Sequence, residues 1–352
     1  MALSGGSQAS RPRLQGIEAT RGIAAVAVVL CHTARHVDKA FGATAATLAF
    51  RVGHAGVDLF FVISGFIILF VHRGDIGRPR RLPHYLGRRF TRVVPLYWVG
   101  LALSVVLATA GGHPLALLRL ALSATLLPTV AEPVMGIAWT LQYEAVFYAV
   151  FAVLILHRLA GLALLAAWLA WIAAAACGLG ADGVPSALCG SYGLEFFMGM
   201  GVAQALHRGW APPPRLAAGA GLLLLSGAGV LEGAGLLDGY GALARLAYGL
   251  PAALLVLGVA AADRAGSLTV PGWLRRIGGA SYSIYLFQFV FIGAAWQAWR
   301  AVGLDRHAPA FACFLALSAA GVAGGLATAR LVEQPLLRLI RGRRRVLAPQ
   351  RA

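Results

Sequence analysis

Acidic residues are scarce in this sequence, and three of them stand with a histidine inside long apolar runs. Of the 13 Asp and Glu residues among 352, Asp58, Glu144 and Glu195 interrupt such runs, as does His32. A charged side chain is costly in an apolar medium, so residues of this kind are candidates for function. A buried imidazole beside a carboxylate is suited to removing a proton from a hydroxyl group. The sequence therefore predicts a proton-transfer site in which His32 and these acids lie at a similar depth.

A second set of polar residues consists of arginines. Arg89 and Arg92 are three residues apart at the start of an apolar run, so on a helix they share a face and suit a multiply charged phosphate group. Arg21 precedes His32 by eleven residues, which on a helix places both on one face, about 16 Å apart along the axis. We interpret this pair as the two ends of a polar track. The alternatives are that Arg21 extends to a membrane surface and that His32 only bonds a neighbouring helix.

The composition requires that membrane-spanning helices position these residues. Hydrophobic residues make up 59% of the chain and charged residues 12%, against about 25% in soluble domains, which excludes an ordinary soluble globule. Apolar stretches of about 20 residues, the length that crosses a bilayer, recur along the whole chain. We predict an all-α, polytopic integral membrane protein with about ten transmembrane helices. The predicted spans are residues 16–36, 53–72, 93–111, 136–156, 159–178, 188–207, 216–236, 241–262, 280–304 and 310–332.

The net charge of +17 is explained by the orientation of these helices. Such a charge by itself suggests a nucleic-acid partner, but the arginines gather in short loops, above all in the loop 73–92. Arg and Lys collect in cytoplasmic loops. We therefore predict that this loop and both termini are cytoplasmic, that the bilayer surrounds the chain, and that no nucleic acid is bound. The predicted division is a tail over residues 1–15, a transmembrane domain over 16–335 and a basic tail over 336–352. The stretch 114–127 is too short to span and is predicted to be interfacial or re-entrant.

Neither a metal site nor a covalent nucleophile is indicated. The four cysteines have no metal-ligand spacing, and no metal is expected. A bridge between Cys177 and Cys189 stays open, since both fall near the ends of neighbouring spans. Ser64 is followed by Gly65, a pair more typical of close helix packing than of catalysis, and no base adjacent to it is evident.

Six motifs, in order over nearly the whole chain, resemble the membrane acyltransferase family 3, the O-acyltransferases that modify O-antigens and exopolysaccharides. They are Gly16-Ile-Glu18-Ala-Thr-Arg21-Gly22 with His32, Gly56-Val-Asp58-Leu-Phe-Phe-Val-Ile-Ser64-Gly65-Phe66, Arg88-Arg89-Phe-Thr-Arg92 with Pro95-Leu-Tyr97-Trp98, Trp139-Thr-Leu-Gln-Tyr-Glu144, Ser281-Tyr-Ser-Ile-Tyr285-Leu286, and Val332-Glu333-Gln-Pro335. The fourth motif is most similar to the exopolysaccharide acetylation subgroup. The residues expected to support the site are Ser64, Tyr97, Trp139, Glu195, Tyr285 and Glu333.

The resemblance implies an acyl-CoA donor, usually acetyl-CoA, as a substrate rather than a bound cofactor. The acceptor it implies is a hydroxyl group of a glycan or lipid-linked sugar. Arg89 and Arg92 would hold the CoA phosphates, and the track from Arg21 to His32 would admit the thiol arm.

By the same resemblance, His32 would act as general base on the sugar hydroxyl, with Glu144 or Asp58 orienting it. Gln288 stands where the family often has histidine, which weakens any mechanism with two histidines. Ala145 stands where many members have a second Glu. The family also implies a place in the bacterial cytoplasmic (inner) membrane, with polysaccharide assembly proteins as partners.

Two other classes of function compete with this interpretation. A carrier of a lipid-linked sugar or acyl group would use His32, Asp58 and Glu144 as a proton relay. A non-catalytic subunit of a polysaccharide assembly would not need its arginines and His32 to act together. Direct transfer and a covalent intermediate both stay open, as do acetyl or succinyl as the acyl group, the acceptor and the oligomeric state.

Overall fold

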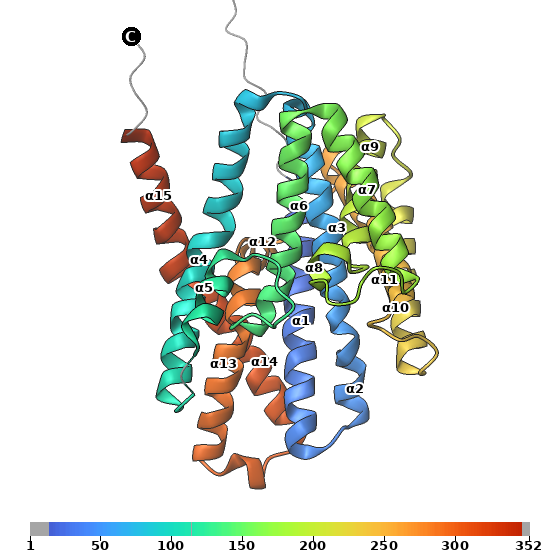
Figure 1. The fold of residues 1–352 in the computed structure, drawn as a ribbon. Helices are drawn as coiled ribbons and strands as arrows, with labels where there is room; N and C mark the ends of the chain where they lie inside the picture. The colour runs from blue at the N-terminus through green and yellow to red at the C-terminus, as the bar shows by residue number, and fades with distance from the viewer. Residues whose placement is uncertain (1–13, 114, 347–352) are drawn as a thin grey trace, which may run out of the picture.

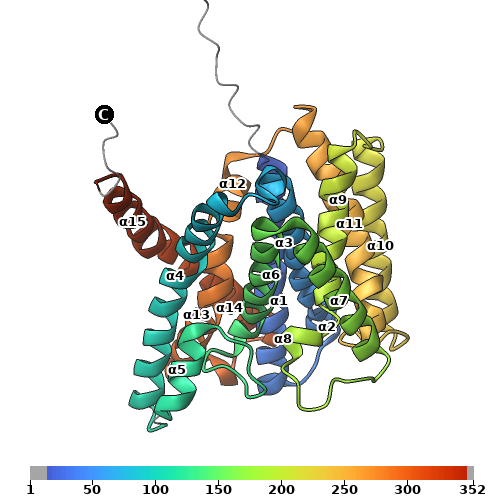
Figure 2. The same cartoon turned by 45° about the horizontal axis from the view of Figure 1, so that its top comes forward.

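The computed structural model describes residues 14–113 and 115–346, and in this part of the chain all regular structure is helical. The long helices lie side by side in an elongated bundle (Figure 1; Figure 2). Those not treated separately below are α1 (Gln15–Phe41), α6 (Trp139–Leu156), α7 (Arg158–Ala176), α10 (Pro214–Gly233), α11 (Ala242–Arg264) and α13 (Ser281–Ala301). The predicted all-α class is therefore confirmed for the described residues.

Fewer helices than predicted meet the length needed for a span. Eight described segments are long and apolar enough to cross a membrane, and nine if the bent pair of α12 (Gly272–Gly279) and α13 forms one span. The predicted span 188–207 is broken into α8 (Ser186–Cys189) and α9 (Gly193–His207). Because α9 has 15 residues, it falls short of the length that crosses a bilayer. The count of ten is not reached by this criterion.

The second span begins earlier than the predicted 53–72. A short helix α2 (Ala45–Arg51) and a 3-10 turn η1 (Val52–Ala55) lead into α3 (Gly56–His72), and the whole candidate span is Thr47–Asp75. Gly56 faces Ala24 and Val28 of the antiparallel helix α1. Asp58 lies further along α3, on the Arg21 side of this contact. The prediction that Asp58 lies at the depth of His32 is wrong. Because the span begins at Thr47 and not at residue 53, Asp58 lies further from the end of the span, toward the middle of the bundle.

The short helix α9 nevertheless packs closely against neighbouring helices, which are α3, α6, α7 and α11. A β-carbon on Gly65 of α3 would collide with the carbonyl oxygen of Phe196, and one on Gly199 would collide with that of Val62. Glycine at both positions lets the two backbones approach closely, as expected for the small-residue pairs in the sequence. Phe196 also stacks on Phe147 of α6, with ring centres 4.4 Å apart. These contacts hold α3, α6 and α9 in a fixed relation.

The arginine-rich segment begins a helix rather than remaining a loop. Helix α4 (Leu82–Ala110) starts well before the predicted span 93–111, so Arg89 and Arg92 are helical, as their assumed pairing requires. The turns η2 (Arg73–Asp75) and η3 (Pro79–Arg81) connect α3 to α4. In Figure 1 this connection, the start of α1 and helix α15 all lie at one end of the bundle, which we call the basic end.

At the other limit of the chain, one helical column crosses the predicted domain boundary at 335. It consists of α14 (Ala310–Thr328), a π-helical turn η6 (Ala329–Glu333) and α15 (Gln334–Val346). Residues 1–13 and 347–352 of the two predicted tails lie outside the described residues. Within the predicted stretch 114–127, α5 (Leu117–Thr125) is a nine-residue helix, too short to span. Cys177 and Cys189 are both free, so the bridge left open by the sequence is not formed.

Candidate active site

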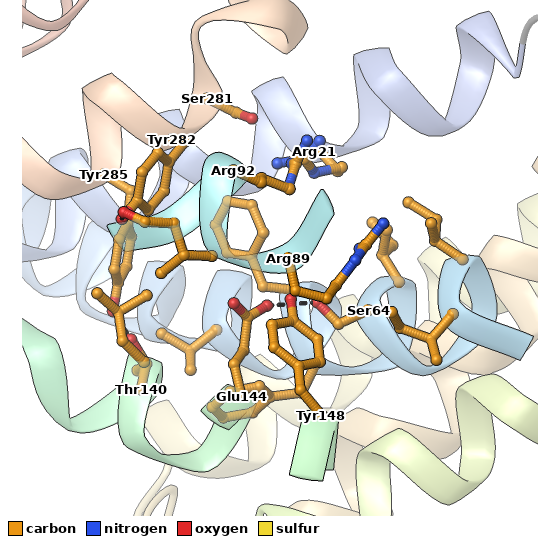
Figure 3. A pocket seen from close by; sticks show the side chains of 18 residues that line it. Arg21, Ser64, Arg89, Arg92, Thr140, Glu144, Tyr148, Ser281, Tyr282 and Tyr285 are labelled. Atoms are coloured by element: carbon orange, nitrogen blue, oxygen red, sulfur yellow. Dashed lines mark hydrogen bonds between the residues drawn. The ribbon is translucent and has the colours of Figure 1, made fainter. Parts of the chain in front are cut away.

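One cavity gathers polar residues from five helices. This arginine cavity has a volume of about 130 Å³ and lies between α1, α3, α4, α6 and α13. Figure 3 shows its polar lining, which consists of Arg21, Ser64, Arg89, Arg92, Thr140, Glu144, Tyr148, Ser281, Tyr282 and Tyr285. Residues from five separate sequence motifs therefore meet around one space.

Positive charge predominates in the arginine cavity. Arg21, Arg89 and Arg92 share it with one lining carboxylate, that of Glu144. Within the described residues, none of the three arginines has an Asp or Glu oxygen within 4.0 Å. The Nε atom of Arg89 is buried without a hydrogen-bond partner, and its guanidinium lies 5.7 Å from the ring centre of Tyr148. Unpaired guanidinium groups in a confined space suit a ligand with several negative charges.

The carboxylate of Glu144 is engaged by a hydroxyl group. Ser64 donates a hydrogen bond from its Oγ to Oε1 of Glu144 at 2.6 Å, and Figure 3 shows the pair beside Arg89. The base that the sequence left unidentified next to Ser64 is therefore Glu144, brought from another helix. The expectation that Glu144 orients His32 is not met, since these two side chains line different cavities.

A second, more open cavity connects the arginine cavity to the basic end. Its volume is about 500 Å³, and it shares Arg21 and Ile67 with the arginine cavity. The other lining residues come from the start of α1 and from Arg275. Arg21 thus stands where a ligand entering from the basic end would pass into the bundle.

His32 lines a third cavity, further from the basic end. This histidine cavity has a volume of about 490 Å³ and an aromatic and polar wall that includes Trp139 and Tyr192. Val57 and Tyr285 line both the arginine cavity and the histidine cavity, so the two spaces meet at these side chains. The hydroxyl of Tyr285 is held by Thr140 at 2.9 Å. The predicted track from Arg21 to His32 therefore consists of successive cavities with Tyr285 at the junction.

The orientation of His32 is set by an amide rather than by an acid. Nδ1 of His32 lies 3.0 Å from Oε1 of Gln288, and Nε2 of Gln288 donates to the carbonyl oxygen of Tyr285 at 2.9 Å. A carbonyl oxygen can only accept, so the amide nitrogen must face Tyr285 and the amide oxygen must accept a proton from Nδ1 of His32. The proton of the neutral imidazole is therefore on Nδ1. Its Nε2 is left with a free lone pair, which is the form a general base requires.

Replacing Gln288 with Leu is expected to lower kcat while leaving the KM for the acyl donor nearly unchanged. Without the amide oxygen, the buried Nδ1 proton loses its partner, and the ring no longer favours the active tautomer. An unsatisfied buried donor costs about 1–3 kcal/mol, which corresponds to a loss of about tenfold to hundredfold in rate. Steady-state kinetics would measure this, with thermal unfolding of the variant as the control for folding. An unchanged kcat would show that Gln288 does not position His32.

Asp58 and Glu195 belong to a structural cluster and not to the histidine site. Arg245 of α11 donates to Oδ1 of Asp58 in a short contact, and its Nη1 atom lies 3.7 Å from Oε1 of Glu195. All three side chains are fully buried. The guanidinium of Arg245 also lies 4.1 Å from the ring centre of Tyr192 and donates to the carbonyl oxygen of Gly239. The expectation that Asp58 orients His32 is therefore corrected, because Arg245 occupies this carboxylate.

The other expected supporting residues divide between cavity walls and internal contacts. Tyr97 donates to the carbonyl oxygen of Ser123 at 2.8 Å and ties α4 to α5, away from the cavities. Glu333 accepts a hydrogen bond from Ser283 at 2.5 Å. Trp139 lines the histidine cavity, while Ser64 lines the arginine cavity. Within the described residues, no group of His, Cys, Asp and Glu side chains is placed to hold a metal ion.

A family model described as an acyltransferase domain matches residues 14–330, nearly the whole chain. The chain belongs to this acyltransferase family. The acyltransferase is 36% identical to the exopolysaccharide production protein ExoZ of Rhizobium meliloti (strain 1021), over 84% of this chain and 93% of that protein. It is also 28% identical to the acyltransferase MdmB of Streptomyces mycarofaciens, over 96% of this chain and 94% of that protein. No solved structure matches it.

Sequence reasoning missed Arg245 and Tyr148 and misjudged the role of Gln288 in this acyltransferase. Arg245 stands inside an apolar helix, so the argument that singled out Asp58 and Glu195 should also have singled out this cation. Gln288 was regarded as the loss of a titratable group, although an amide oxygen can orient a histidine as well. Tyr148 was not singled out from the sequence, because its place beside Arg89 follows from the packing of α4 on α6.

Proposed function

We propose that the acyltransferase moves an acetyl group from acetyl-CoA to a hydroxyl group of a cell-surface or lipid-linked glycan. The observation that carries this proposal is the arrangement of two cavities that meet at Tyr285 and Val57. One cavity holds three arginines and the other holds a histidine with a free Nε2. Such a site can bind an anionic donor on one side and a hydroxyl-bearing acceptor on the other.

On the donor side, Arg21, Arg89 and Arg92 bind the phosphates of CoA. These groups lie near the basic end, which we assign to the cytoplasm of a bacterial inner membrane on the rule that Arg and Lys collect in cytoplasmic loops. The pantetheine arm extends from there past Tyr285 toward His32. The separation of Arg21 and His32 along α1, about 16 Å, is one that an extended arm can span.

On the acceptor side, Nε2 of His32 removes the proton of the sugar hydroxyl as its oxygen attacks the thioester carbonyl. The carbon–sulfur bond then breaks, the acetyl group stays on the sugar oxygen, and the proton returns from His32 to the CoA thiolate. The name of ExoZ links that relative to exopolysaccharide production, which supports a polysaccharide acceptor and proximity to polysaccharide assembly proteins for this chain.

The test is an assay with purified protein in nanodiscs, acetyl-CoA and lipid-linked glycans from a strain that lacks the gene. Free CoA and acetylated glycan are expected to appear in equal amounts. A carrier would move its cargo without releasing CoA, so the absence of both products in a folded, donor-binding sample would contradict the proposal.

In the same assay, Arg89→Gln is expected to raise the KM for acetyl-CoA by about tenfold to hundredfold with a smaller effect on kcat. The physical reason is the loss of a charge-assisted hydrogen bond to a phosphate. Arg88→Gln is the matched control, because Arg88 is the adjacent residue on α4 but is exposed and does not line the cavity. Equal KM values for wild type and Arg89→Gln would show that Arg89 does not bind the donor and serves only to orient the helices in the membrane.

A further inference from the structure

The histidine cavity contains a cation without an acidic partner. Arg35 is three residues after His32 on α1, so it lies on nearly the same face, about 4.5 Å further along the axis. Both side chains line the cavity, and Arg35 is its single Arg or Lys among the described residues. Its guanidinium donates to the hydroxyl of Tyr240 and lies 5.3 Å from the centre of that ring. No Asp or Glu oxygen of the described chain lies within 4.0 Å of it.

The nearby acids are occupied by other groups. Asp38 binds Arg51 at 2.6 Å. Glu232 lies 2.8 Å from Nε2 of His54 and accepts a hydrogen bond from Tyr248 at 2.5 Å. Arg35 therefore has Tyr240 as its partner but no carboxylate within 4.0 Å among the described residues, and it is half-buried in the lining of the histidine cavity. Among the described residues, Glu132 is the one carboxylate that lines the histidine cavity; it belongs to the segment between α5 and α6 and forms no ion pair with Arg35.

We propose that Arg35 and the Tyr240 hydroxyl form an anion subsite, so that the acceptor carries a negatively charged group close to the hydroxyl that is acetylated. This inference rests on the proposed function and narrows its acceptor class. The anion is either the carboxylate of an acidic sugar or a phosphate of the lipid carrier. Arg35 recognises both, because a guanidinium forms paired hydrogen bonds with either group. Its position one turn from His32 fixes which hydroxyl reaches the base.

The subsite can be tested without acyl transfer, by protection of His32 from diethylpyrocarbonate. This reagent modifies the free nitrogen of a neutral imidazole, and mass spectrometry of the peptide that contains His32 gives its rate. The probes are glucose, glucuronate and glucose 1-phosphate at constant ionic strength, with the full-length protein in nanodiscs. His84 is exposed in the first turn of α4, outside the histidine cavity, and serves as the internal reference that no probe should protect.

We expect at least one anionic probe to protect His32 at a concentration about tenfold or more below that of glucose, because an ionic hydrogen bond is stronger than a neutral one. Stronger protection by glucuronate indicates an acidic sugar, and stronger protection by glucose 1-phosphate indicates the carrier phosphate. Arg35→Gln should bring the three probes to within about twofold of one another. Arg300→Gln, at an exposed arginine outside the cavity, should keep the wild-type preference.

Equal protection by all three probes in the wild type would overturn the subsite, as would a preference that survives in Arg35→Gln. The result also separates the subsite from the reaction. If the anionic probes protect His32 but acetyl-CoA supports no transfer to any glycan, the proposed function fails and the anion subsite stands. If transfer occurs without any anionic preference, the proposed function stands and the acceptor is uncharged at this position.

Discussion

Replacement of His32 with Ala is expected to lower acetyl transfer by about 10²–10⁴-fold, the usual contribution of a positioned general base. The loss should appear in kcat, because the arginines that bind the donor lie in a different cavity from His32. The KM for acetyl-CoA should therefore change little. Steady-state release of CoA in the presence of acceptor measures both values.

The control for this variant is His36→Ala. His36 is one turn beyond His32 on the same helix, but it packs against Trp296 with ring centres 5.2 Å apart and does not line the histidine cavity. It should retain nearly full activity if the role belongs to His32 alone. Full transfer by His32→Ala would eliminate the general-base assignment and would direct attention to Ser64 and Glu144, the other nucleophile and base in contact.

Replacement of Arg245 with Leu is expected to destabilise the protein by about 3–5 kcal/mol. The variant leaves Asp58 fully buried without the cation that contacts it, and removes the nearest positive charge from Glu195. An uncompensated buried charge costs far more than the loss of a surface ion pair. Thermal or denaturant unfolding in detergent, followed by the fluorescence of the Trp residues, would measure the change.

A double variant makes this second prediction specific. Arg245→Leu combined with Asp58→Leu removes both charges of the pair and should be more stable than Arg245→Leu alone, because apolar replacements at both positions avoid the stranded carboxylate. If the two single effects simply add in the double variant, Arg245 and Asp58 are not coupled. Arg264→Leu, at an exposed arginine near the end of the same helix, provides the comparison.

These two experiments address different uses of the same kind of residue. Polar side chains inside the bundle were predicted to form one site. The cost of burying a charge identifies such residues as candidates for function, but it does not distinguish a catalytic role from a structural one. In the structure, these side chains fall into two groups that differ in the residues they contact. His32 lines a cavity, and Gln288 binds its Nδ1 and leaves its Nε2 free. Asp58, Glu195 and Arg245 instead contact one another and line neither the arginine cavity nor the histidine cavity. Only the first group is placed for chemistry.

Much of the fold could be predicted because apolar stretches long enough to span a bilayer indicate an all-α membrane protein directly. The boundaries were less accurate where helix continues into polar sequence, as in α4 and α15. The break between α8 and α9 was missed because Glu195 is the one Asp, Glu, Lys or Arg residue in the run 188–207, so its composition is that of a single span. Its short second part is stabilised by glycines that let it approach α3 closely, a contact that a one-dimensional pattern does not contain.

By itself, the sequence determined that the chain is a helical membrane protein, that it carries the motifs of an acyltransferase, and that its arginines and His32 stand on shared helix faces. These properties depend on composition and on neighbours along one helix. Which polar groups pair was decided by the tertiary structure alone. Glu144 meets Ser64, Asp58 meets Arg245, and Gln288 takes the place beside His32 that was expected for an acid. The physical reason is that such contacts join different helices, so they depend on the depth and rotation of each helix in the bundle.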